Sequence, residues 1–208
     1  MSYFPIKIQE VDSNKIYVVR SPEQLPSGIA FKVIQINVEH EIFDEHETFD
    51  FNDGNGPVPA ARHINKNGDL GGWVAKTAKV ADSCYIWENA RVYGNAEISG
   101  DAKVYGNAQI YGNAKISGNA KISGNAAVFR NAQISGNAQI YGNARIYGNA
   151  KVYGNAIIYD NAKVFDNVQI FDNALIYGNA TVFRNAQIYG DAEISGNVKI
   201  YGDAEIYG

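Results

Sequence analysis

The chain has 208 residues and a formal net charge of −4, and its single cysteine, Cys84, excludes an internal disulfide. Residues 1–72 carry 6 Lys/Arg against 11 Asp/Glu, whereas residues 73–208 carry 12 against 11. The near-neutral second part excludes a basic stripe that would bind nucleic acid through bulk charge. Because the first residues lack a signal-peptide pattern and no apolar run approaches membrane-spanning length, we expect a cytoplasmic protein without membrane contact.

The first 70 residues form a predicted N-terminal cap that is rich in β-strands. All five prolines and all three histidines lie within the first 63 residues, so composition marks a boundary near residue 70. Alternating runs around Asp12-Ser13-Asn14 predict a hairpin, Ile29 to Phe43 a longer strand, and residues 50–60 a loop. Because an open solenoid end exposes core and unpaired strand edges, we expect this segment to pack on the array that follows.

The array is defined by one position. From Val74 to Ile206, every sixth residue is Ile or Val, without exception over 23 positions. We call this the core position. A small residue, usually Ala, stands two residues before it (the small position), and Gly followed by Asn or Asp usually stands two and three residues after it (the turn pair). The residues immediately before and after the core position are the leading and trailing positions.

This pattern predicts one short strand and one sharp turn in every six residues. Strand side chains alternate, so small and core positions point inward while leading and trailing positions point outward. Gly and Asn tolerate the left-handed backbone of a tight corner. Three strands close a triangular coil, and coils stack about 4.8 Å apart, with Asn amides hydrogen-bonding along each corner.

We therefore predict an all-β fold in two parts. Residues 71–208 form a left-handed parallel β-helix, a hexapeptide-repeat solenoid of between seven and eight triangular coils. Residues 1–70 form the small N-terminal β-rich cap.

The repeat resembles the hexapeptide repeat of left-handed parallel β-helices, whose best-known family is the hexapeptide acyltransferases, over about two thirds of the chain. The junction Gly68-Asp69-Leu70-Gly71-Gly72-Trp73-Val74, followed by NAxVYG repeats, is similar to a group of bacterial and phage-borne hexapeptide-repeat proteins. The resemblance implies a transferase label, a trimer, and a phage-associated or injected protein as the alternative to a cytoplasmic one.

The acyltransferase resemblance also implies a catalytic histidine on the array and, in many members, a loop extruded from a coil. The array has neither, so His63, just before the junction, is the one catalytic candidate; a surface histidine is the alternative. Cys84 occupies a small position and is interpreted as a small buried filler rather than a nucleophile. The acidic stretch around His40 and His46 is interpreted as a solvated edge. No cofactor and no metal are expected, and a non-catalytic protein is favoured.

Residues 18 apart stack on one face of a three-sided coil. The trailing positions of the first face are Tyr93, Tyr111, Phe129, Tyr147, Phe165, Phe183 and Tyr201. Those of the second face are Ser99, Ser117, Ser135, Tyr153, Phe171, Tyr189 and Tyr207. Those of the third face are Trp87, Tyr105, Ser123, Tyr141, Tyr159, Tyr177 and Ser195. Such rings either only stabilise the ladder or form an apolar strip that a partner covers.

The seven aromatic residues of the first face, together with Arg91, Arg145 and Lys163, form a predicted binding surface. Arg130, Arg184 and Lys199 also lie at adjacent outward or turn positions of this face. Aromatic and cationic groups together suit a glycan or an acidic protein partner; nucleic acid is the less favoured ligand. Asp166 stands one coil from Arg184, so we expect these two charges to pair in part.

The third face carries a predicted subunit interface. Its leading positions are mostly polar, but Ile157 and Leu175 are apolar and are flanked by Tyr141, Tyr159 and Tyr177. A dimer and a trimer fit these residues equally well. A second interface is expected at the last coil, at Ile206 and Tyr207, where the sequence stops without a cap.

Three functions follow from these patterns. The favoured one is a non-catalytic β-solenoid scaffold or binding module that self-associates through its side face or its C-terminal coil. The alternatives are a hexapeptide acyltransferase-like enzyme and a glycan- or nucleic-acid-binding surface.

Overall fold

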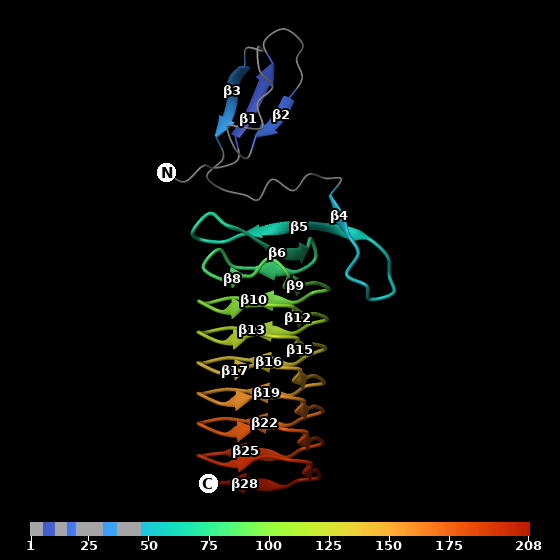
Figure 1. Cartoon of the computed structure of the whole chain (residues 1–208), viewed down its shortest axis with the longest axis vertical. Coiled ribbons are helices and arrows are strands. Elements are labelled where there is room, and N and C mark those ends of the chain that lie inside the picture. The colour runs from blue at the N-terminus through green and yellow to red at the C-terminus, as the bar shows by residue number, and fades with distance from the viewer. Residues whose placement is uncertain (1–5, 11–15, 20–30, 37–46) are drawn as a thin grey trace.

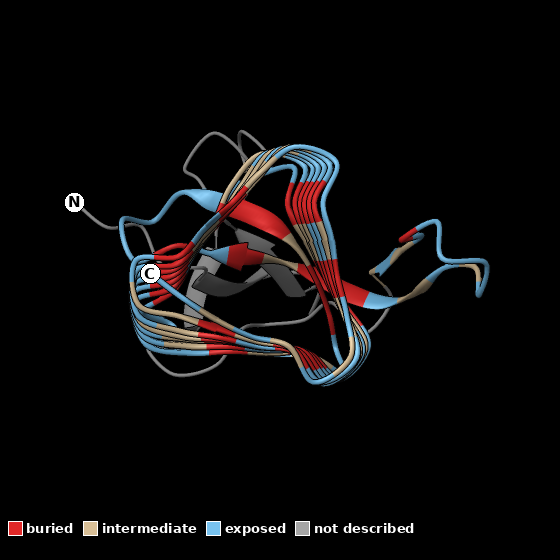
Figure 2. Ribbon diagram, turned by 90° about the horizontal axis from the view of Figure 1, so that it is seen from below, coloured by how far each residue is buried: buried red, intermediate tan, exposed pale blue. Residues whose placement is uncertain are grey.

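The computed structural model describes residues 6–10, 16–19, 31–36 and 47–208. The predicted all-β parallel β-helix is confirmed: short strands coil around one axis and pair with strands 18 residues away (Figure 1). Seen along that axis, the coils superpose as a triangle (Figure 2). No helix long and apolar enough to cross a membrane occurs in the part of the chain that the structure describes.

Each face of the triangle is one sheet. The first-face sheet consists of β4 (Thr48–Phe49), β5 (Val58–Ile64), β6 (Leu70–Ala75), β9 (Arg91–Val92), β12 (Gln109–Ile110), β15 (Ala127–Val128), β18 (Arg145–Ile146), β21 (Lys163–Val164), β24 (Thr181–Val182) and β27 (Lys199–Ile200). The second-face sheet consists of β7 (Lys79–Val80), β10 (Glu97–Ile98), β13 (Lys115–Ile116), β16 (Gln133–Ile134), β19 (Lys151–Val152), β22 (Gln169–Ile170), β25 (Gln187–Tyr189) and β28 (Glu205–Tyr207). The third-face sheet consists of β8 (Tyr85–Ile86), β11 (Lys103–Val104), β14 (Lys121–Ile122), β17 (Gln139–Ile140), β20 (Ile157–Ile158), β23 (Leu175–Ile176) and β26 (Glu193–Ile194).

The core is built from the core and small positions, as the alternation predicts. Core-position side chains from Ile86 to Ile188 are at most 2% exposed, and small-position residues from Cys84 to Ala186 are at most 1% exposed. Full burial of each Ile or Val contributes about 1.5–3 kcal/mol, which makes these positions the main stabilising term of every coil. Val168 fills a small position without any exposure, so the central coils accept a larger side chain there.

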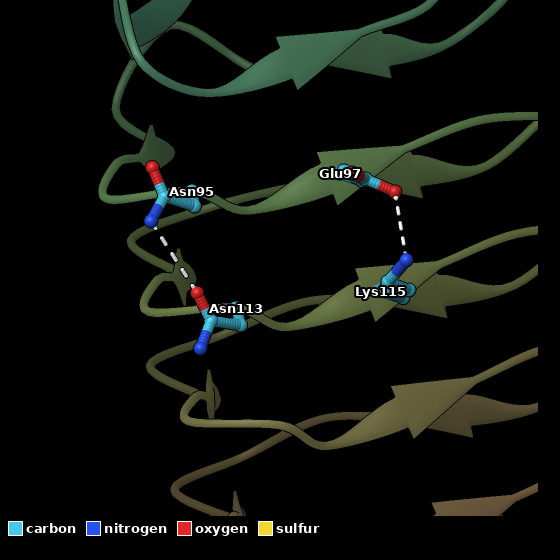
Figure 3. A network of polar contacts seen from close by, with 4 residues as sticks. All are labelled: Asn95, Glu97, Asn113 and Lys115. Atoms are coloured by element: carbon cyan, nitrogen blue, oxygen red, sulfur yellow. Dashed lines mark hydrogen bonds and ion pairs between the residues drawn. The ribbon is translucent and has the colours of Figure 1, made fainter.

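Successive coils are joined by two kinds of hydrogen-bond ladder. Backbone N–H groups donate to carbonyls one coil ahead, as from Lys103 to Ala120 at 2.9 Å. At the corners, most Asn Nδ2 groups donate to the amide oxygen of the Asn one coil ahead, as from Asn95 to Asn113 at 3.4 Å (Figure 3), and Asn173 and Asn185 donate to the carboxylates of Asp191 and Asp203. The predicted asparagine columns are therefore confirmed.

The N-terminal residues that the structure describes lie in two groups. β1 (Ile6–Glu10) pairs antiparallel with β2 (Ile16–Val19), which confirms the predicted hairpin, and with β3 (Phe31–Ile36). The part of the predicted long strand beyond Ile36, and both His40 and His46, lie outside the described residues.

The second group, from residue 47 on, extends the first-face sheet. β5 pairs antiparallel with β6, which pairs parallel with β9 of the first coil. The prediction of a loop over residues 50–60 is wrong at its end: β5 begins at Val58, because Ala60 pairs with Ala75 and the backbone of the array's first strand supplies its hydrogen-bond partners. β4 and β5 form an antiparallel hairpin that lies beside the first coils (Figure 1).

Candidate functional site

The first-face trailing residues form one continuous aromatic stack. Neighbouring rings from Tyr93 to Phe165 lie nearly parallel with centroids 4.7–4.8 Å apart, and the spacing widens to 5.2 and 5.5 Å towards Tyr201. This spacing follows the distance between coils, because each ring stands on the same position of its own coil. The faces of the internal rings therefore cover one another, and the ring edges remain for contact with a ligand.

Sequence reasoning missed the residue that closes the stack at its N-terminal end. Phe51, from the loop between β4 and β5, stacks on Tyr93 with a centroid distance of 4.7 Å. Phe51 is 2% exposed and Tyr93 is 7% exposed, so Tyr93 is not the outward surface residue that its trailing position predicts. Phe49 lies on Trp73 in the same way, at 4.5 Å. The only sequence signal was the alternation of Phe49 and Phe51 before the glycine-rich stretch.

Alkaline pH is expected to destabilise the protein through Tyr93. Burial raises the Tyr93 pKa, nearby Tyr111 and Asp53 raise it further, and Arg91 lowers it. Because the folded-state pKa lies above the unfolded value near 10, the stabilisation is complete below about pH 10 and is lost as pH rises through the folded pKa. The free energy of unfolding should fall by up to about 1.4 kcal/mol per pH unit in that window.

Urea denaturation at a series of alkaline pH values measures this slope. Tyr93→Phe should flatten it, whereas Tyr201→Phe, which changes an exposed ring of the same stack, should keep it. An equal slope in all three proteins would contradict the assignment to Tyr93.

The predicted cations of the first face do not gather at one place. Arg91 lies at the N-terminal end of the array, where its guanidinium carbon is 5.5 Å from the Phe49 ring centroid. Arg145 and Lys163 are exposed and lie side by side in register on the adjacent parallel strands β18 and β21. The structure thus brings Arg145 and Lys163 together and separates Arg91 from them.

Two more of the cations expected on this face stand at the corner that follows it. Arg130 and Arg184 occupy the glycine place of the turn pair with φ angles of 61° and 65°. A left-handed backbone costs a residue with a Cβ atom about 1–2 kcal/mol. Their guanidinium carbons lie 5.8 Å from the ring centroids of Tyr147 and Tyr201, respectively.

The expected pairing of Asp166 with the Arg184 side chain is wrong. The Asp166 carboxylate instead accepts a hydrogen bond from the backbone N–H of Arg184 at 3.2 Å. The one ion pair within residues 47–208 joins Lys115 to Glu97 on the second face at 3.1 Å (Figure 3).

On the third face the structure assembles the central part of the predicted interface. Ile157 and Leu175 pair in register on β20 and β23, and both are partly exposed. Tyr141, Tyr159 and Tyr177 stack beside them with centroids 4.8 and 4.9 Å apart. Five apolar or aromatic side chains therefore form one patch, which we call the third-face patch.

Ile206 and Tyr207 are not part of that patch. Both belong to β28 on the second face, where Tyr207 is 73% exposed and stacks on Tyr189 at 5.7 Å. The predicted interface residues therefore divide into two separate places.

His63 lies in the interior rather than on a solvated surface. Its side chain is 1% exposed, and Nε2 lies 3.3 Å from the carbonyl oxygen of Cys84. A general base must reach its substrate, so this burial argues against the catalytic role considered for His63. Cys84 is buried, as predicted for a filler, and burial raises the pKa of its thiol. Within the described ranges, no cluster of three or more His, Cys, Asp or Glu side chains could hold a metal ion.

Comparison with known proteins supports the fold. A family model described as the YdcK beta solenoid repeat matches residues 138–151, 168–184 and 174–190. The matched stretches cover several coils of the array, and they establish a similarity to β-solenoid repeats there. No curated protein sequence matches the chain.

Proposed function

We propose that the chain is a β-solenoid scaffold that self-associates through the third-face patch. The observation that carries this proposal is the in-register pair of Ile157 and Leu175, two apolar side chains at leading positions of an outward surface. Lys121 and Gln139 precede them in the same column, and Glu193 follows. An apolar centre with polar ends is typical of a protein interface.

Charge along the third face favours a second copy in the opposite direction. Lys121 lies two coils before Ile157, and Glu193 lies two coils after it; both side chains are exposed. A two-fold axis at Ile157 brings Lys121 opposite Glu193 of the partner subunit, and the same pair forms again on the other side. Two-fold dimers are the commonest symmetric assembly, and this arrangement is self-complementary.

The size of the face agrees with a dimer. Seven strands spaced about 4.8 Å apart span about 29 Å, and a six-residue side is about 15–20 Å wide. Two such faces bury about 900–1,200 Å² in total, which is around the lower bound of about 1,000 Å² for a biological interface and fits a weak, reversible dimer.

Carbodiimide cross-linking of the wild-type protein tests the proposal without any substitution. Lys121 and Glu193 of one copy lie four coils apart, about 19 Å, which is beyond the reach of a zero-length cross-link. A linked peptide pair containing Lys121 and Glu193 is therefore expected in a dimeric species. Lys115 and Glu97, 3.1 Å apart, provide an internal control that should be linked within one chain.

Cross-linked chains that lack the Lys121–Glu193 pair, in a sample where Lys115–Glu97 is linked, would contradict the proposed interface. The relation to bacterial and phage-borne hexapeptide-repeat proteins, the acyltransferase-like alternative and the cytoplasmic location stay predictions.

A further inference from the structure

The non-glycine residues of the array that have a left-handed backbone fall into two groups, which differ in the contacts that offset the backbone strain. Most corners use Gly, but Arg130, Asp160, Asp166, Asp172 and Arg184 also have positive φ. Each of the three aspartates has a carboxylate that accepts a hydrogen bond at 3.2 Å from the backbone N–H of the corner one coil ahead. This contact joins adjacent coils and explains why aspartate is tolerated at these corners.

Arg130 and Arg184 have no such contact with the next corner. Within residues 47–208 neither guanidinium forms an ion pair or a hydrogen bond, and each lies 5.8–5.9 Å from the centroid of an aromatic ring. Both stand at the same corner, three coils and about 14 Å apart. Strained backbone that folding alone does not explain is a sign of function, and here it presents two cations along one edge.

A groove of about 500 Å³ runs between these two arginines. It is lined by Arg130, Asp166 and Arg184 and by the asparagine column of that corner, from Asn131 to Asn185. Each amide nitrogen of the column uses one N–H for the ladder, as from Asn149 to Asn167 at 3.0 Å. Since an amide has two N–H donors, a row of donors remains for a ligand at about the spacing of the coils.

The aromatic stack lies between the groove and the exposed cations Arg145 and Lys163 along the direction of the strands. The Arg130 guanidinium carbon lies 5.8 Å from the Tyr147 ring centroid, and Arg145 is the leading residue of β18, the strand that Tyr147 follows. Burial and Asp166 raise the pKa of Tyr147, whereas Arg130 and Arg145 lower it. The same two arginines act on the hydroxyl of Tyr111, whose pKa is raised by burial. Along the chain, Arg145 stands at the leading position before the aromatic column and Arg130 at the turn position after it, so cations flank this section of the stack.

We propose that the Arg130–Arg184 corner binds an acidic oligosaccharide. Guanidinium groups bind carboxylates through paired hydrogen bonds, while asparagine amides and the Asp166 carboxylate suit sugar hydroxyls. The edges of the stacked rings provide apolar contact for sugar C–H groups. This binding is independent of the third-face interface.

One feature favours a sugar chain over a nucleic acid. Single-stranded nucleic acid is held by bases that stack on free ring faces, and the faces in this column are covered by one another.

Calorimetric titration with three probes tests the proposal: an alginate oligosaccharide, a neutral maltooligosaccharide of the same length, and single-stranded oligothymidylate. The key variant is the double substitution Arg130→Gly and Arg184→Gly. Glycine is the usual residue of this corner and relieves the left-handed strain, so the variant should melt no lower than the wild type. Lys151→Gln, which removes a cation from the second face, is the matched control.

We expect alginate to bind the wild type with an affinity that falls as salt is added, and the double variant to bind about tenfold or more weakly. Lys151→Gln should keep the wild-type affinity, and the maltooligosaccharide should not bind. Failure of alginate to bind would overturn the proposal, as would unchanged binding by a folded double variant. Tighter binding of oligothymidylate than of alginate would overturn the choice of a glycan.

Discussion

Gly72→Ala is expected to lower the free energy of unfolding by about 3 kcal/mol, although alanine is the usual residue at the small position. An added Cβ atom would lie 2.2 Å from the carbonyl oxygen of Ala90 and 2.6 Å from that of Trp87. Both are backbone atoms of the adjoining coil, so relief requires movement of β6, the strand that joins β5 to the first coil. The close approach explains why the junction carries glycine at this place.

Cys84→Ala is the matched control, because it places alanine at another small position where a larger side chain is already buried. This variant should lose much less stability than Gly72→Ala. Urea denaturation followed by tryptophan fluorescence measures both effects, since Trp73 and Trp87 are the two tryptophans; Trp73 follows Gly72 in the chain, and the Trp87 carbonyl oxygen lies next to it. Equal stability of wild type and Gly72→Ala would show that the junction backbone is looser than described.

Ile157→Lys is expected to weaken self-association by about a hundredfold or more. At the proposed two-fold axis, Ile157 meets Ile157 of the partner subunit, so the substitution places two like charges in contact inside an apolar centre. An uncompensated buried charge costs about 3–5 kcal/mol, and each 1.4 kcal/mol changes the dissociation constant about tenfold. Folding should be retained, because the side chain points outward from β20.

Gln169→Lys controls for the added charge. Gln169 is an exposed leading residue of the second face, on β22, in the coil that includes Leu175. Sedimentation equilibrium of the two variants gives both dissociation constants. Weakening of similar size in both would indicate a general charge effect rather than an interface at Ile157.

The array could be predicted closely from the sequence because its information is periodic. An aliphatic residue at every sixth position, from Val74 to Ile206, is buried along one axis when three strands close each coil, as the pairing of strands 18 residues apart shows. The positive φ of Gly94 and the amide contact of Asn95 follow from the same repeat. Each residue of the array meets mainly its own equivalents one coil away, so sequence spacing determines its neighbours.

Residues outside the repeat could not be placed in this way. Phe51 covers Tyr93 through a hairpin contact between segments more than forty residues apart, and no period connects them. His63 lies in a polar stretch of sequence, yet β5 turns its side chain towards Cys84 in the interior. These contacts depend on how the N-terminal segment meets the first coil, which the local pattern does not encode.

The candidate surfaces were predicted in part, for a related reason. Periodicity places Ile157, Leu175 and their tyrosines on one face, and the structure brings them together. Periodicity does not show whether a ring presents its face or its edge, because that depends on the distance between coils. Nor does it show that Asp166 contacts a backbone N–H while Arg184 keeps its guanidinium without an ion pair within the described residues.

Sedimentation velocity of the wild-type chain over a wide range of concentration tests the central claim most directly. The proposed third-face interface predicts a reversible change from one chain to a species of twice that mass as concentration rises. A single species with the mass of one chain at every concentration would contradict self-association through the Ile157 and Leu175 patch.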